Sequence, residues 1–194
     1  DSNFVYIIDL TQKYTSHKVP PYNILFRHAF ALDSLQRNWI FISDNRPLMK
    51  TIVSVQAQFD STENISGQAA IFSYDFAKED QLQSKNKEEK DEEEEEARRR
   101  KLIDLTTFDY QEENAEDYMS PLLEKFNFRY TVTHTNEFYY FQPMFIALFR
   151  DNPFVADARQ TDIDMGCNQQ FLFQMSLTLP PPGTIYESIP ASIF

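Results

Sequence analysis

Alternation of apolar and polar side chains is the clearest pattern in the chain, and it is strongest in the stretch that begins at Phe126. Every second residue from Phe126 to Val132 is aromatic or β-branched, and the residues between them are polar. Because successive side chains of a strand point to opposite faces, this stretch predicts a half-buried strand. A polar break at residues 134–136 precedes a second apolar run, Glu137 to Phe149. Two runs joined in this way are typical of a hairpin, which we expect to form the middle of a sheet.

The same alternation marks further strands along the chain. Met49 to Phe59 and Gln68 to Phe76 both alternate, and their spacing predicts an antiparallel pair. Gln170 to Leu179 alternates as well, with large apolar side chains on one face. Asn38 to Ser43 contains the run Trp-Ile-Phe-Ile, which predicts a compact buried strand. Residues 23–35 fit both strand alternation and helical spacing, and we favour a strand because aromatic and β-branched residues follow.

Short strands separated by turn signals, with little amphipathic helix, indicate one mainly β domain over residues 1–194. We expect an antiparallel β-sandwich or a jelly-roll-like barrel. Residues 109–118 are predicted to be an acidic loop, and Ser120-Pro121 to start a short helical turn that the serine caps. Residues 102–108 fit either a helix or a strand.

A charged insertion at residues 78–101 interrupts the strand pattern. Glu79 to Glu96 holds ten acids and three lysines, a net charge of −7 out of −12 for the whole chain. Glutamates four residues before Arg98, Arg99 and Arg100 each favour a helix by roughly 0.2–0.5 kcal/mol. We expect a solvated insertion, either helical or disordered, that contributes little apolar burial; a docking surface for a basic partner is the weaker alternative.

Composition excludes several classes of function. With only three glycines, the chain contains neither of the glycine-rich loops that bind nucleotide phosphates. A net charge of −12 without a basic stripe argues against nucleic acid and against direct contact with an anionic membrane. The single cysteine, Cys167, excludes an intramolecular disulfide and a cysteine-based zinc site. We therefore expect no cofactor and no metal.

No group of residues specifies a reaction. His17, His28 and His134 lack a neighbouring carboxylate or second histidine at ligand spacing, so structural roles are favoured for all three. Cys167 precedes a predicted strand, where a buried and inert thiol is the ordinary interpretation. A calcium loop or hydrolase site is a weaker hypothesis, and its carboxylates would come from Asp157, Asp162 and Asp164.

Aromatic side chains are abundant, with 18 Phe and 10 Tyr, and most are predicted to fill a core. The run that follows the polar break, however, is apolar on both faces, and so is the C-terminal tail. Such segments are either central in a sandwich or covered by another subunit. The predicted interface residues are Tyr139, Phe141, Phe145, Tyr186, Ile189 and Phe194.

These observations favour a non-enzymatic structural or accessory subunit of a larger assembly, with other protein subunits as partners. The alternative is a ligand-binding ectodomain or lumenal β-sandwich domain of a membrane protein, with an adjacent membrane anchor outside the sequence. Two features suit this alternative. Asn64-Ile65-Ser66 is a glycosylation sequon, and the sequence opens on Asp1 rather than Met, so we expect a processed chain.

Overall fold

A computed structural model describes residues 13–14, 16–32, 37–59, 64–88, 105–134, 139–141, 143, 145–146 and 165–179. This part of the chain is mainly β, as the sequence predicts. In chain order its elements are η1 (Tyr22–Ile24), β1 (Arg27–Leu32), β2 (Arg37–Ile42), β3 (Met49–Phe59), β4 (Asn64–Tyr74), α1 (Asp75–Glu88), β5 (Leu105–Glu113), β6 (Leu122–Thr131), β7 (Thr133–His134), β8 (Tyr139–Tyr140) and β9 (Gln169–Thr178).

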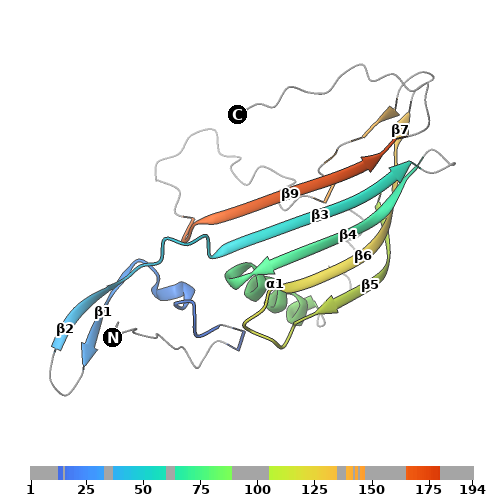
Figure 1. Ribbon diagram of the computed structural model, residues 1–194. Helices are drawn as coiled ribbons and strands as arrows, with labels where there is room; N and C mark the ends of the chain where they lie inside the picture. The colour runs from blue at the N-terminus through green and yellow to red at the C-terminus, as the bar shows by residue number, and fades with distance from the viewer. Residues whose placement is uncertain are drawn as a thin grey trace.

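A five-stranded mixed sheet with the order β5-β6-β4-β3-β9 dominates the molecule (Figure 1). The predicted pairing of β3 with β4 is confirmed, and it runs from Lys50↔Tyr74 to Phe59↔Ile65. The expectation of a purely antiparallel sheet is wrong, because β9 runs parallel to β3. The described residues form no closed barrel, and the sandwich arrangement stays a prediction.

The sheet has one covered face and one open face. On the covered face, Val53 and Val55 of β3 lie beside Ile65 of β4 and Phe128 of β6, and all four side chains are almost completely buried. The alternating apolar positions of β9 pack against this core, as the alternation predicts. On the open face the same strands present mainly polar side chains, among them Gln56, Gln68 and Asn127.

Among the described residues, Phe128 has the largest fully buried side chain. It lies directly across from Gly67, where an added Cβ would overlap the carbonyl oxygen of Gln56. The Phe128 ring packs against Phe145 with a centroid separation of 5.1 Å, and Phe145 stacks on Tyr130 at 5.0 Å. Residues distant in the sequence thus close one end of the core.

The predicted central hairpin is only partly correct. Its first strand is β6, but β6 lies second from an edge, and β4 occupies the middle of the sheet. Of the predicted second strand, the described residues form β8, which pairs with β7 over two residues; much of that run lies outside the described residues. Among the described residues that follow, Pro143 lacks the N–H that a ladder requires, and Phe145 turns onto the core.

The charged segment is helical at its start, but it is not simply solvated. Helix α1 buries Phe76 and Leu82 on one side, together with the polar side chains of Lys78 and Glu79. Its hydrogen bonds reach Ser73 and Glu124 on the covered face, so α1 lies against the sheet. The rest of the predicted insertion, residues 89–101, lies outside the described residues.

Two predictions for the chain before β6 are wrong. Residues 109–113 extend strand β5 instead of forming a loop, because β6 offers them partners such as Lys125 for Gln111. Leu122 opens β6 instead of a helical turn, and its side chain is fully buried. Tertiary pairing and burial overrode the local capping signal at Ser120.

A second, smaller core joins the β1–β2 hairpin to the sheet. It consists of Val19, Leu25, Leu48, Phe76 and Cys167, all buried. The backbone N–H of Phe26 donates to the carbonyl of Ile42 at 2.7 Å and closes the base of the hairpin. Beyond this base, β1 and β2 project past the end of the five-stranded sheet (Figure 1).

We expect Phe128→Ala to lower the free energy of unfolding by about 3–5 kcal/mol, because it removes a fully buried ring and leaves a cavity. Phe108→Ala is the matched control: this ring is 47% exposed, and its removal should change stability by less than about 1 kcal/mol. Urea unfolding of both variants measures the difference. Equal effects would contradict the assignment of faces.

Candidate functional site

The β1–β2 hairpin carries an exposed aromatic surface, which we call the aromatic hairpin face: His28, Phe30, Trp39 and Phe41. The register places His28 beside Phe41 and Phe30 beside Trp39 on one side of the two strands. Ring centroids are 5.0 Å apart in the first pair and 5.2 Å in the second. Trp39 is nevertheless 69% exposed, Phe41 54% and Phe30 45%, so paired rings face solvent.

This arrangement contradicts the prediction that residues 38–43 form a buried strand. The strand is present, but only Ile42 at its base is buried. The apolar side chains of this run have neighbours within the hairpin itself. Ile40, for example, lies across from Ala29 on the side opposite the aromatic rings. Because the hairpin projects beyond the sheet, the main core does not reach Trp39.

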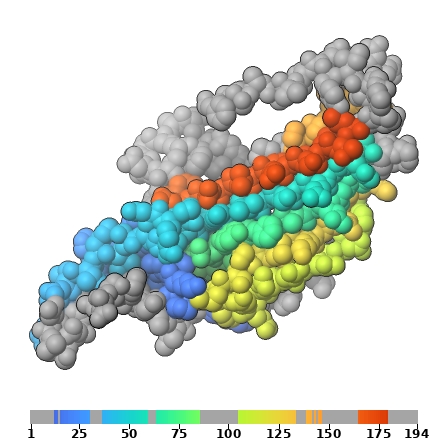
Figure 2. Space-filling view, in the orientation of Figure 1, coloured from blue at the N-terminus to red at the C-terminus, as the bar shows by residue number. Residues whose placement is uncertain are grey.

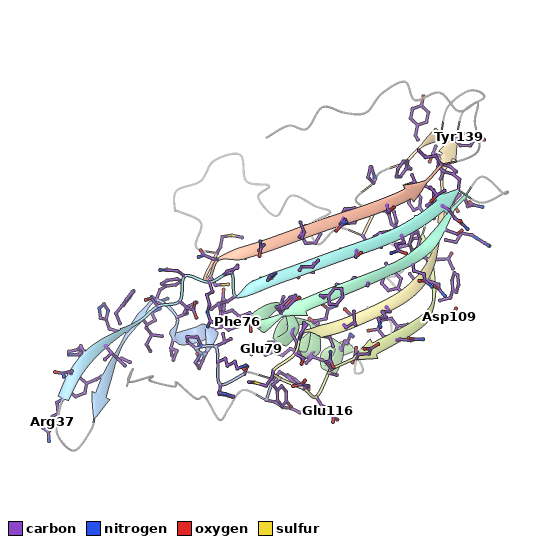
Figure 3. All side chains as sticks on the ribbon, in the orientation of Figure 1. Arg37, Phe76, Glu79, Asp109, Glu116 and Tyr139 are labelled. Carbon is purple, nitrogen blue, oxygen red and sulfur yellow. The ribbon has the colours of Figure 1, made fainter. Side chains whose placement is uncertain are left out.

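The two strands of the hairpin are basic within an acidic protein, although the sequence places Asp33 between them. The described residues of its two strands include Arg27 and Arg37 and no acid, while the chain has a net charge of −12. Arg37 stands at the far tip of the hairpin (Figure 3), and Arg27 starts its first strand. Both arginines are exposed; Arg37 shares the face of Trp39 and Phe41, whereas Arg27 lies on the opposite face of the hairpin.

A second group of functional side chains lies between α1 and the covered face. The buried Glu124 carboxylate of β6 accepts hydrogen bonds from the Tyr110 hydroxyl at 2.5 Å, Gln81 Nε2 at 2.7 Å and Lys85 Nζ at 2.8 Å. Lys85 Nζ also bonds Glu112 and Tyr110. Strands β5 and β6 and helix α1 together build this polar cluster.

Electrostatics in the polar cluster favour the ion pairs. Burial disfavours the charge on Lys85, but hydrogen bonds to Glu112, Glu124 and Tyr110 outweigh it and raise the Lys85 pKa. Burial alone would raise the pKa of Glu112, and bonds from Lys85 and Tyr110 bring it below its ordinary value. Burial and the bond to Glu124 raise the pKa of the Tyr110 hydroxyl, so it stays protonated at neutral pH.

Lys78 forms a separate buried contact nearby. Its ammonium group donates to three backbone carbonyls, of Asn114 at 2.5 Å, Asp117 at 2.8 Å and Ser120 at 3.0 Å. Burial lowers its pKa. Lys78 therefore ties the start of α1 to the turn between β5 and β6.

The polar cluster resembles an acid–base site in composition but not in arrangement. A catalytic carboxylate needs an open position for a substrate proton, whereas Glu124 already accepts from three protein donors and is buried. Lys85 likewise uses its donors on protein acceptors. The arrangement holds α1 on the sheet, and three of the roughly four acceptor positions of the Glu124 carboxylate are occupied.

Three of the six predicted interface residues belong to the described part of the chain, and they differ in exposure. Tyr139 is exposed and lies at the opposite end of the molecule from the hairpin (Figure 3). Phe141 is half-buried, and Phe145 is 3% exposed and belongs to the core. Tyr186, Ile189 and Phe194 lie outside the described residues. Contact of Tyr139 and of the tail with a partner stays a prediction.

Residues considered for chemistry from the sequence are dispersed. His17 is an exposed turn residue, and His28 belongs to the aromatic hairpin face. Cys167 is buried beside the small core, and burial raises its pKa and so disfavours the reactive thiolate. The His134 side chain and the three predicted aspartates, Asp157, Asp162 and Asp164, lie outside the described part.

Within the described ranges, no three His, Cys, Asp or Glu side chains come together as metal ligands would. No described helix is long and apolar enough to cross a bilayer. No protein-family model matches the chain, and no curated protein or solved structure matches it either.

Sequence reasoning missed both groups. The hairpin had a usable signal, because two short alternating strands flank the four residues 33–36. No sequence signal indicated that its rings are exposed, since a Trp-Ile-Phe-Ile run ordinarily indicates burial. The polar cluster joins side chains 39 residues apart along the chain, Lys85 and Glu124, which only the fold brings together.

We expect Lys85→Met to lower the free energy of unfolding by about 1–3 kcal/mol, because it leaves Glu124 and Glu112 without their shared cation. Lys125→Met is the matched control: its ion pair with Glu113 is exposed and should contribute less than about 1 kcal/mol. Chemical denaturation at neutral pH makes the comparison. Equal losses in the two variants would show that burial adds nothing at Lys85.

The stabilisation by Lys85 should depend on pH in a defined direction. Glu112 has a lowered folded-state pKa, so its contribution is present above about pH 4.3 and is lost as pH falls through the folded value. Lys85 has a raised pKa, so its contribution is present below about pH 10.4 and is lost at higher pH. The stability difference between wild type and Lys85→Met should be flat from about pH 5 to pH 9 and shrink outside it. A difference that grows on acidification would refute the pairing.

Proposed function

We propose that this protein is a non-enzymatic subunit of a larger protein assembly and that it docks through the aromatic hairpin face. The observation that carries this proposal is the exposure of Trp39, Phe41 and Phe30 on a projecting hairpin. Large apolar side chains that gather on a surface usually mark an interaction site. The aromatic hairpin face is therefore the surface on which we expect another protein subunit to bind.

A protein groove suits this surface better than other occupants. Trp and Arg are the residue types most enriched at interface hot spots, and the hairpin supplies Trp39 with Arg27 and Arg37. Its rings are already packed in pairs, so binding would immobilise few additional rotamers. The partner would present an apolar groove with an acidic rim, because the hairpin is basic.

The polar cluster supports the non-enzymatic part of the proposal. Its carboxylate and ammonium groups are engaged with one another, and Cys167 is buried. The half-buried side chains of Phe171, Phe173 and Met175 line the covered face, on which a second layer would complete the predicted sandwich. Chain segments or an assembly partner would supply that layer.

The ectodomain alternative has one observation in its favour. The open face of the sheet carries a polar groove of about 290 Å³ next to Gln56 and Gln68, which a ligand-binding domain would use. This alternative does not account for the exposed rings of the hairpin.

The proposal predicts a stoichiometric partner that is cross-linked to the hairpin. We expect the full chain, purified from its native cells after cross-linking, to carry one protein joined to residues 26–43. Trp39→Ser combined with Phe41→Ser should abolish binding of this partner. The melting temperature should change little, because both rings are exposed. Isothermal titration calorimetry of the purified partner with the double variant should show a Kd at least 100-fold higher than with the wild type.

Phe108→Ser is the control, since it removes a ring that is 47% exposed from β5 instead of the hairpin. It should leave partner binding unchanged. Retention of the partner by the hairpin double variant would contradict the proposal. Binding of the hairpin to lipid vesicles in place of any protein would contradict it as well.

A further inference from the structure

The open face of the sheet is hollowed at one place. The hollow, of about 290 Å³, is lined by Ser54, Gln56, Gln68, Ala70, Gln111 and Asn127, together with Asp109 and Lys125 at one side. Ala70 and Ser54 are the small residues at its floor, and they lie directly across from one another on β4 and β3. In Figure 2 the strands that form this face are seen directly, and α1 does not cover them.

The side chains around this hollow form an ordered row across the sheet. The registers align Gln56 of β3 with Gln68 of β4, Gln68 with Asn127 of β6, and Asn127 with Phe108 of β5. Three amides thus run across neighbouring strands and end at an aromatic ring that is 47% exposed. We call these four residues the amide row.

The three glutamines that line the hollow have hydrogen-bonding capacity to spare, whereas Asn127 already uses one donor on Asp109. Among the described residues, no hydrogen bond engages the side chains of Gln56, Gln68 or Gln111. Each amide offers two N–H donors and one carbonyl acceptor, so the hollow presents both kinds of partner within a short distance. A ligand with many hydroxyl groups matches this surface, because each hydroxyl both donates and accepts.

The charges beside the hollow are already neutralised or bonded. Lys125 pairs with Glu113 at 2.7 Å, and Asp109 accepts from Asn127 Nδ2 at 2.8 Å. Figure 3 labels Asp109 on β5, beside the hollow. An anionic ligand therefore finds no unpaired cation among the described residues that line the hollow, and a polyanion is also repelled by the net charge of −12.

We propose that the amide row binds a neutral oligosaccharide. Vicinal hydroxyl groups would bond the amides of Gln56, Gln68 and Asn127, and the C–H face of a sugar ring would lie on Phe108. An extended peptide fits less well, because it binds a sheet by pairing with backbone at an edge. Here the backbones of β4 and β6 are already paired on both sides within the sheet. This site is independent of the aromatic hairpin face.

Titration of the full-length, ¹⁵N-labelled protein with neutral pentasaccharides of glucose, mannose, galactose and N-acetylglucosamine tests the proposal. We expect saturable shifts of side-chain amide resonances with at least one of them, with a Kd of about 0.1–10 mM, as suits a small open site. Gln56→Ala combined with Gln68→Ala should weaken binding at least tenfold.

Gln170→Ala is the matched control, because it removes an exposed amide from the same face on β9, outside the hollow. It should leave the Kd unchanged. No saturable shift with any of the four sugars would overturn the proposal, and so would binding that survives the double variant. Shifts given only by heparin or by an extended peptide would overturn it too. None of these outcomes bears on the hairpin, whose partner is assayed with separate variants.

Discussion

Exclusion of water from one face of the five-stranded sheet is the constraint on which the rest of the structure depends. Val53, Val55, Ile65 and Phe128 meet on that face and need cover. Phe145 turns away from the expected hairpin to supply part of it, and α1 lies across one end. The other face carries mainly polar side chains, with Phe108 and Leu172 as exposed apolar ones among them. The two faces thereby acquire different capacities: one holds the fold together, and the other remains open to a ligand.

Helix α1 shows how a highly charged segment can serve as cover. It has few apolar side chains to bury, and polar contacts complement Phe76 and Leu82. Lys85 and Gln81 bond the buried Glu124, and Lys78 bonds three carbonyls of the turn before β6. The buried polar groups in these contacts need hydrogen-bond or ion-pair partners, since a buried carboxylate without a partner is strongly destabilising. With these bonds, three of the roughly four acceptor positions of Glu124 are occupied within the protein.

Local periodicity made much of the sheet predictable. Strands β3, β4, β6 and β9 follow from alternation within each segment, and so do the faces of Phe128 and of β9. Features set by long-range pairing could not be foreseen. Parallel pairing of β9 with β3 and the extension of β5 past Asp109 depend on which strands meet. Trp39 is the opposite case, because a local pattern that ordinarily indicates burial occurs on a hairpin that the core does not reach.

The central claim is that the aromatic hairpin face is uncovered in the isolated chain and available to a partner. Trp39 is the only tryptophan, so fluorescence excited at wavelengths that the ten tyrosines do not absorb reports on this surface alone. At protein concentrations spanning two orders of magnitude, we predict the emission of a hydrated indole that acrylamide quenches almost as readily as free tryptophan. A blue-shifted emission protected from acrylamide would contradict the claim, because it would show that the chain or a second copy of it already covers the hairpin.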